Sequence, residues 1–160
     1  MNRDESRPIE DIVADGLWNG AVATVATTAA VAVCGAIENR RVAAPINAVS
    51  HIVYGDEAAE HSAPSIKYTA PGLLLNAAAV TSWAVLQELM FGRQQTHKTV
   101  GVALAEGAIV SALAYVVDYH VVPSRFTPGF EKRLSNRSLA GIYFVLAASL
   151  GVASWVRRGA

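Results

Sequence analysis

The chain has 160 residues and a mass of 16.9 kDa, the usual size of a single domain. Apolar residues make up 52% of the chain and charged residues 16%, against roughly 25% charged residues in ordinary soluble domains. The 13 Lys and Arg residues balance the 13 Asp and Glu residues, so we expect no nucleic-acid partner. The apolar content excludes an intrinsically disordered chain, and the single cysteine, Cys34, excludes a disulfide scaffold.

Four long apolar stretches dominate the sequence. The first, residues 16–37, has no charged residue and would be about 33 Å long as a helix, enough to cross a hydrocarbon core of about 30 Å. The others cover residues 68–91, 99–118 and 138–156. We therefore predict an all-α fold in which residues 1–160 form one transmembrane domain, a four-helix bundle. The alternative is a soluble Ala-rich bundle, but these helices would have no polar face for water.

Four membrane crossings would place both chain ends and the loop at residues 92–98 on one side, which we call side A. The longer loops, residues 38–67 and 118–137, would lie on the opposite side, side B. Side A carries Arg3, Arg7, Arg93, Lys98, Arg157 and Arg158, and side B carries Arg40, Arg41, Lys67, Arg125, Lys132, Arg133 and Arg137. Because these counts are nearly equal, the distribution of positive charge does not set the orientation.

The first side-B loop contains a short amphipathic pattern at residues 45–54. A proline at its first position and a glycine directly after it are typical helix boundaries. Its polar residues share one helical face: Asn47, Ser50, His51 and Tyr54. We predict a short interfacial helix that lies at the membrane surface with this face toward the lipid headgroups, or that re-enters the membrane.

Titratable side chains also gather in the side-B loops. His51, Asp118 and His120 are candidate catalytic residues, because imidazoles and carboxylates can exchange protons near neutral pH. Residues two apart diverge on a helix, so Asp118 and His120 would converge only if His120 lay beyond the helix end. The alternative is a structural cluster in which His51 and Asp118 tie the short helix to the bundle. The basic residues that we expect to bind lipid or phosphate are Arg125, Lys132 and Arg133.

Polar residues inside the apolar stretches form a further group. Glu106 would lie about 10 Å below the side-A surface and is a candidate for a functional protonatable group; the alternative is a structural carboxyl bonded between helices. Placing an ionised carboxylate at mid-membrane raises the free energy of insertion by about 2.5–3.5 kcal/mol. Such a group is therefore paired with a cation, protonated, or in contact with water. We predict that Asn19, Asn76 and Glu88 form polar contacts between helices. The usual metal-binding and nucleotide-binding motifs are absent, so we expect no metal and no cofactor.

Two loop regions carry a resemblance to other proteins. One reads PINAVSH at 45–51 and YGDEAA at 54–59, and the other reads DYHVVP at 118–123 and TPGFE at 127–131. They resemble the loops of a family of small four-span bacterial inner-membrane proteins with no established activity. The resemblance implies a multi-pass protein of the bacterial inner membrane and no particular chemistry.

Two functions stay open at this point. The first is a structural or accessory membrane protein, or a small transport-related subunit. Since four helices rarely enclose a pathway alone, transport would need a homo-oligomer or a larger membrane complex. The second is a membrane-embedded enzyme that acts on lipid or polyprenyl headgroups through His51, Asp118 and His120, with Arg125 holding phosphate.

Overall fold

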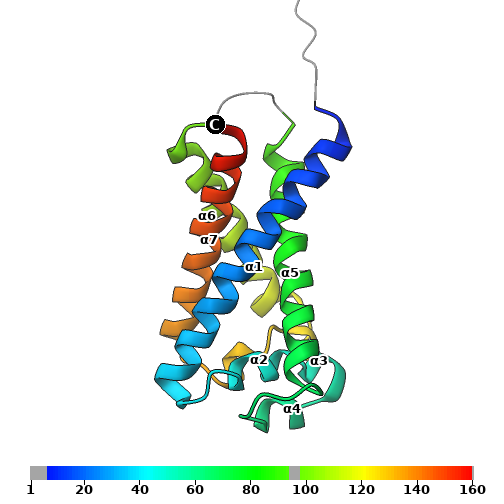
Figure 1. The fold of residues 1–160 in the computed structure, drawn as a ribbon, viewed down its shortest axis with the longest axis vertical. Helices are drawn as coiled ribbons and strands as arrows, with labels where there is room; N and C mark the ends of the chain where they lie inside the picture. Colours follow the sequence, from blue (N-terminus) through cyan, green and yellow to red (C-terminus); the bar gives the residue numbers. More distant parts are fainter. Residues whose placement is uncertain (1–6, 94–97, 160) are drawn as a thin grey trace, which may run out of the picture.

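The computed structural model describes residues 7–93 and 98–159, and every regular element among them is a helix (Figure 1). The four long helices are α1 (Ile9–Asn39), α5 (Thr69–Phe91), α6 (Val100–Val116) and α7 (Asn136–Gly159). They confirm the predicted all-α bundle of four long apolar helices. Arg3, one of the side-A cations, lies outside the described residues.

The first helix is longer than predicted. It begins at Ile9 rather than at residue 16, and its acidic residues Glu10 and Asp11 occupy the first turn. Negative charge is favourable there because the backbone N–H groups at a helix start carry partial positive charge. Charged residues do not belong to an uncharged apolar stretch, so the predicted bounds begin after them, although they are good residues for a helix start. The predicted bounds of the other three long helices lie within a few residues of those observed.

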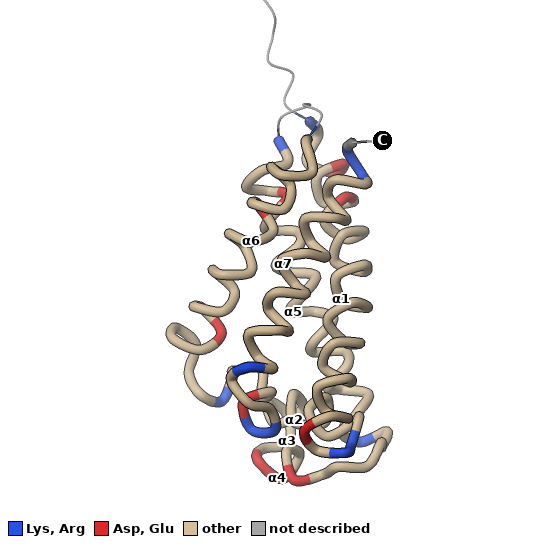
Figure 2. The backbone as a smooth tube through the Cα atoms, turned by 90° about the vertical axis from the view of Figure 1, so that its left-hand side faces the viewer, with Lys and Arg blue, Asp and Glu red and all other residues tan. Residues whose placement is uncertain are grey.

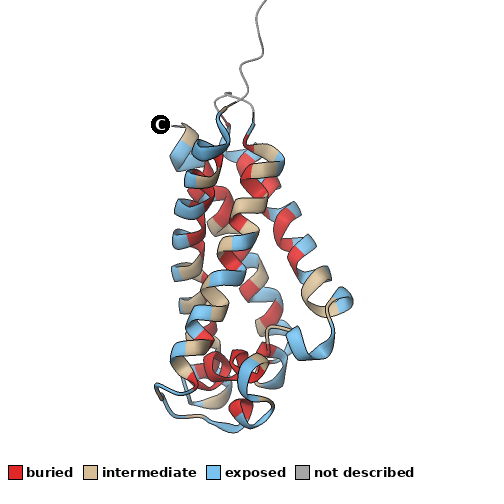
Figure 3. Cartoon of the chain, turned by 90° about the vertical axis from the view of Figure 1, so that its right-hand side faces the viewer, coloured by how far each residue is buried: buried red, intermediate tan, exposed pale blue. Residues whose placement is uncertain are grey.

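Glycines allow the long helices to pack closely in pairs. A Cβ added to Gly20 of α1 would lie 2.8 Å from the Cα of Thr81 in α5. A Cβ added to Gly107 of α6 would lie 2.3 Å from the carbonyl oxygen of Ala147 in α7. In contrast, α6 has few contacts with α5 and runs away from it toward side B, which is at the bottom of Figures 2 and 3.

The outward faces of the bundle are apolar. Val25, Leu74 and Phe144, on three different helices, are 71%, 72% and 74% exposed. Charged residues gather toward the two ends of the bundle (Figure 2). By length and composition, α1, α5, α7 and the continuous segment Val100–Val121 are each long and apolar enough to cross a membrane.

Short helices close the side-B end of the bundle. The loop after α1 contains α2 (Ala44–Val49), α3 (His51–Tyr54) and α4 (Glu57–Glu60). The segment after α6 contains the π-helical turn η1 (Val117–Val121) and the 3₁₀ turns η2 (Ser124–Phe126) and η3 (Phe130–Lys132). The two segments pack on each other, with α2 against η3 and α3 against η2.

The amphipathic pattern at residues 45–54 forms α2 and α3, which are divided at Ser50, instead of one helix. The expectation that its polar face is turned toward headgroups is wrong for Asn47, Ser50 and His51, which are buried with the rest of residues 43–51 (Figure 3). Tyr54, the last residue of that face, is 37% exposed. The side-chain amide of Asn47 donates to the carbonyl oxygens of His61 at 3.0 Å and Ala63 at 2.9 Å, and it accepts from the Thr69 hydroxyl at 2.6 Å. The polar face is buried because the first loop folds back over it and supplies hydrogen-bond partners.

Candidate functional site

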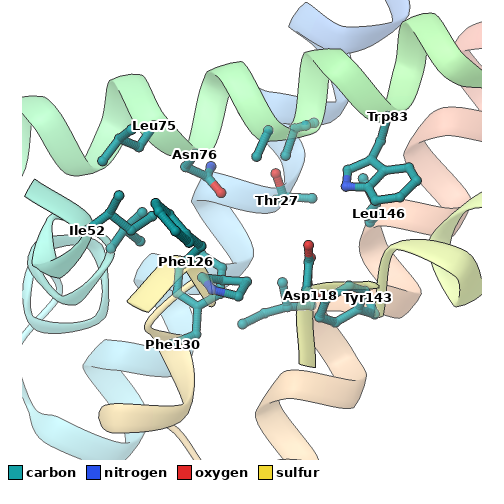
Figure 4. Close-up of a pocket in the computed structure, with 15 residues that line it drawn as sticks. Thr27, Ile52, Leu75, Asn76, Trp83, Asp118, Phe126, Phe130, Tyr143 and Leu146 are labelled. Atoms are coloured by element: carbon teal, nitrogen blue, oxygen red, sulfur yellow. The ribbon is translucent and has the colours of Figure 1, made fainter. Parts of the chain in front are cut away.

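A cavity of about 310 Å³ lies above the side-B loops, between the helices of the bundle. Side chains of α1, α5, α7 and η1 line it together with residues of α2, α3, η2 and η3. Trp83 and Leu146 lie at one end, and Ile52 and Phe126 lie at the other (Figure 4). Its lining is mainly apolar with a few polar groups, which is typical of small-molecule sites of about 300–1,000 Å³.

Three polar side chains project into this cavity, namely Thr27, Asn76 and Asp118 (Figure 4). The Tyr143 hydroxyl donates to Oδ2 of Asp118 at 2.6 Å. Asn76 of α5 donates through Nδ2 to the Thr28 hydroxyl of α1 at 3.2 Å, so it links two helices as well as lining the cavity. These groups give an otherwise apolar site a small number of fixed hydrogen-bonding positions.

The π-helical turn η1 sets the direction of Asp118. In this turn the amide of Val122 donates to the carbonyl oxygen of Val117, five residues earlier, at 3.0 Å. Such wide turns are rare and often occur at functional sites. Asp118 faces the cavity, whereas His120 is exposed and its ring centroid lies 5.7 Å from that of Tyr115. The sequence pattern gave no sign of this change of helix type.

A second pocket, of about 210 Å³, is polar and lies at the same end of the bundle. It is lined by His51, Gly55, Asp56, Ser124, Arg125 and Lys132. Lys132 donates to the Asp56 carboxylate at 2.8 Å, and this hydrogen bond and charge hold the pKa of Asp56 below its usual value. The third predicted basic residue, Arg133, donates instead to the carbonyl oxygen of Ala59.

His51 is buried beside this polar pocket, with 3% of its surface exposed. Its Nδ1 lies 2.8 Å from the carbonyl oxygen of Ala48, and since a carbonyl only accepts, Nδ1 carries a proton. Its Nε2 is buried and has no hydrogen-bond partner within the described part of the chain. Gly129, with a φ of 85°, makes this arrangement possible, because a Cβ there would lie 2.8 Å from Nδ1 of His51.

The three candidate catalytic residues of the side-B loops do not share one pocket. His51 lines the polar pocket, Asp118 lines the apolar cavity, and His120 lines neither of the two. Over residues 7–93 and 98–159, no three His, Cys, Asp or Glu side chains form a group that could hold a metal ion. The side-B end therefore holds two separate pockets, one apolar and one polar.

At side A, the predicted interhelical residues Asn19 and Glu88 meet in a buried polar cluster. Glu88 of α5 is fully buried and pairs with Arg158 of α7. Its Oε1 also accepts hydrogen bonds from Asn19 of α1 and Ser154 of α7, each at 2.9 Å. One carboxylate thus joins three helices.

Asp15 extends this cluster to the end of the bundle. It accepts hydrogen bonds from Arg7 at 2.7 Å and from Arg157 at 2.8 Å, and Nε of Arg158 lies 3.8 Å away. Asp15 was not among the predicted interhelical residues, because its link to α7 goes through Arg157, 142 residues away in the chain. The one local feature that pointed to Asp15 is its place at the end of the acidic segment before the first apolar stretch.

Glu106, the candidate protonatable group of the third stretch, lies apart from both side-B pockets. It pairs with Lys98, and the two side chains are 12% and 5% exposed. This pairing offsets the cost of burying a carboxylate in an apolar helix.

Comparisons with known proteins give no relative for this chain: no family model, no curated protein and no solved structure matches it.

Proposed function

We propose that the chain is a multi-pass membrane protein whose cavity holds the apolar chain of a lipid-like ligand, in the membrane half next to side B. The observation that carries this proposal is the 310 Å³ apolar cavity, which lies between α1, α5, α7 and the η1 turn that follows α6. A cavity between lipid-facing helices can fill from the bilayer. In this arrangement α2 and α3 re-enter the membrane edge, and the bacterial inner membrane remains the expected location from the resemblance of the loops.

The polar groups of the cavity explain how a ligand would be selected. A hydrocarbon chain gains little by leaving lipid for a protein cavity, because lipid tails are as apolar as the cavity wall. Retention must therefore come from the fit to the cavity and from hydrogen bonds. Asp118 and Asn76 are placed to provide such bonds to a polar atom near the chain.

This proposal makes the protein a lipid-binding accessory component rather than a catalyst. An enzyme that acts on headgroups through His51 and Asp118 needs both side chains at one reacting centre, and they line separate pockets. The binding function needs only the cavity and an opening toward lipid.

Two neighbouring alanines of α5 allow a matched test. Both are exposed, but Ala79 lines the cavity and Ala78 does not. Ala79→Trp would place an indole ring at the wall of the cavity, where it would compete with a ligand, and Ala78→Trp would place the same ring outside the lining. Native mass spectrometry of the detergent-purified protein would measure bound dioleoylphosphatidylcholine.

We expect the wild type and Ala78→Trp to retain the lipid. Ala79→Trp should bind it with an affinity at least about tenfold lower, which corresponds to a loss of about 1.4 kcal/mol or more in binding free energy. Equal retention by the two variants would contradict the proposal, as would a wild-type protein that retains no lipid.

A further inference from the structure

The apolar cavity and the polar pocket are built from the same two short helices. In α3, His51 lines the polar pocket and Ile52 lines the cavity. In η2, Arg125 lines the polar pocket and Phe126 lines the cavity. Because consecutive Cα atoms are 3.8 Å apart, the walls of the two pockets lie within a few ångströms of each other. A lipid whose chain occupied the cavity would therefore have its headgroup close to the polar pocket.

The polar pocket has an excess of positive charge. Lys132 is matched by Asp56 at 2.8 Å, but Arg125 is exposed and forms no ion pair with the residues that the structure describes. An unmatched guanidinium presents a planar set of N–H donors that suits a phosphate or a carboxylate. The pocket therefore favours an anion.

The buried imidazole is an independent observation that points to a ligand. His51 lines the pocket, is 3% exposed and has an Nε2 without a partner in the described part of the chain. Buried polar atoms are normally satisfied, so an orphaned one calls for a missing partner. With Nδ1 donating to the Ala48 carbonyl oxygen, Nε2 is the ring atom left to accept a hydrogen bond from a ligand hydroxyl.

We propose that the polar pocket binds the anionic phosphate group of the lipid whose chain occupies the cavity. Arg125 and Lys132 provide the positive charge, and His51 Nε2 provides the buried hydrogen-bonding partner. This inference rests on the proposed function, since the cavity beside the pocket makes a lipid rather than free phosphate the ligand. A phosphate monoester fits best, because its P–OH can donate to a neutral imidazole and its charged oxygens can accept from Arg125.

The test compares phosphatidic acid, phosphatidylcholine and inorganic phosphate as ligands of the detergent-purified protein, with titrations followed by native mass spectrometry. Arg125→Gln removes the unmatched cation. Arg137→Gln is the matched control, because Arg137 is an exposed arginine of α7 that lies outside the pocket lining. His51→Asn keeps a donor in the position of Nδ1 and removes Nε2, so the bond to Ala48 is preserved.

We expect the wild type and Arg137→Gln to prefer phosphatidic acid over phosphatidylcholine by roughly 10- to 100-fold, the effect of one hydrogen bond to a charged group. Arg125→Gln and His51→Asn should lose most of this preference. If His51→Asn does not fold, the inference is still tested by comparing Arg125→Gln with Arg137→Gln in their preference for phosphatidic acid.

Two results would overturn the inference and leave the proposed function intact. One is equal binding of the two lipids while Ala79→Trp loses both. The other is an affinity of the wild type for inorganic phosphate as high as its affinity for phosphatidic acid. The pocket would then be a site for free phosphate and not for a lipid headgroup. If the wild type binds neither lipid, the proposed function fails and this inference fails with it.

Discussion

Replacing Arg158 by methionine tests how the buried carboxylate of Glu88 is stabilised. The side chains of this pair are 7% and 0% exposed, so water screens their interaction little. Methionine keeps much of the aliphatic volume and removes the charge. Glu88 would then keep only the neutral donors of Asn19 and Ser154.

The size of the effect follows from this burial. Removing one partner of a buried ion pair typically costs about 3–5 kcal/mol, because the remaining charge is left uncompensated. The folding equilibrium should therefore shift by roughly 10²- to 10⁴-fold toward the unfolded state. Arg157→Met is the matched control on the same helix. The Arg157 side chain is 48% exposed and Asp15 keeps Arg7 at 2.7 Å, so we expect a loss of only about 0–1 kcal/mol.

The assay is unfolding of the detergent-solubilised protein by sodium dodecyl sulfate, followed by far-ultraviolet circular dichroism. Glu88→Gln added to Arg158→Met should recover stability, since the glutamine oxygen still accepts from Asn19 and Ser154 without a buried charge. Equal unfolding free energies for Arg158→Met and Arg157→Met would refute the reasoning. Failure of the double variant to recover would show that the loss comes from packing and not from charge.

The remaining predictions concern helix packing and pH. Gly107→Ala places a Cβ 2.3 Å from the carbonyl oxygen of Ala147, so we expect a loss of about 1–3 kcal/mol in thermal unfolding. Gly101→Ala, with open space around it on the same helix, should be neutral or stabilise by up to about 1 kcal/mol; similar losses in both would contradict the packing argument. The pKa of Asp56 lies below its usual value because of Lys132, so the stability that this pair contributes is complete above the unfolded pKa and is lost as the pH falls through the folded pKa. Lys132→Met should raise the pKa of Asp56 toward its ordinary value in a carboxyl-carbon nuclear magnetic resonance titration, and an unchanged titration would rule out the ion pair.

The four long helices were predictable because length and apolar content are local properties of the sequence. The start of α1 was not, because its first turns carry Glu10, Asp11 and Asp15, whose charges do not look like part of an apolar span. The burial of Asp15 becomes understandable only with its partners Arg7 and Arg157 in the fold. The direction in which the polar face of α2 is turned could not be predicted either. Its polar face has the spacing of a surface helix, and only the returning first loop turns Asn47 into a buried hydrogen-bonding residue.

The candidate site was predictable in its residue types and not in its layout. His51, Asp118 and Arg125 stand out as polar residues in the side-B loops of an apolar chain. Their division between two pockets depends on the π-helical turn at Asp118 and on the close approach of Gly129 to α2 and α3, which are tertiary effects. The cavity itself is the space that helix packing leaves unfilled, and no periodic pattern in the sequence encodes such a space.

The arginine pairs at side A also constrain the order of assembly. During translation α1 and α5 leave the ribosome before α7, so Asp15 and Glu88 exist for a time without Arg157 and Arg158. Asp15 still has Arg7 during this time, but Glu88 has no cation, and an ionised carboxylate without a partner is costly in lipid. We therefore expect α7 to complete the polar cluster at side A, and a chain truncated before α7 to pack less stably.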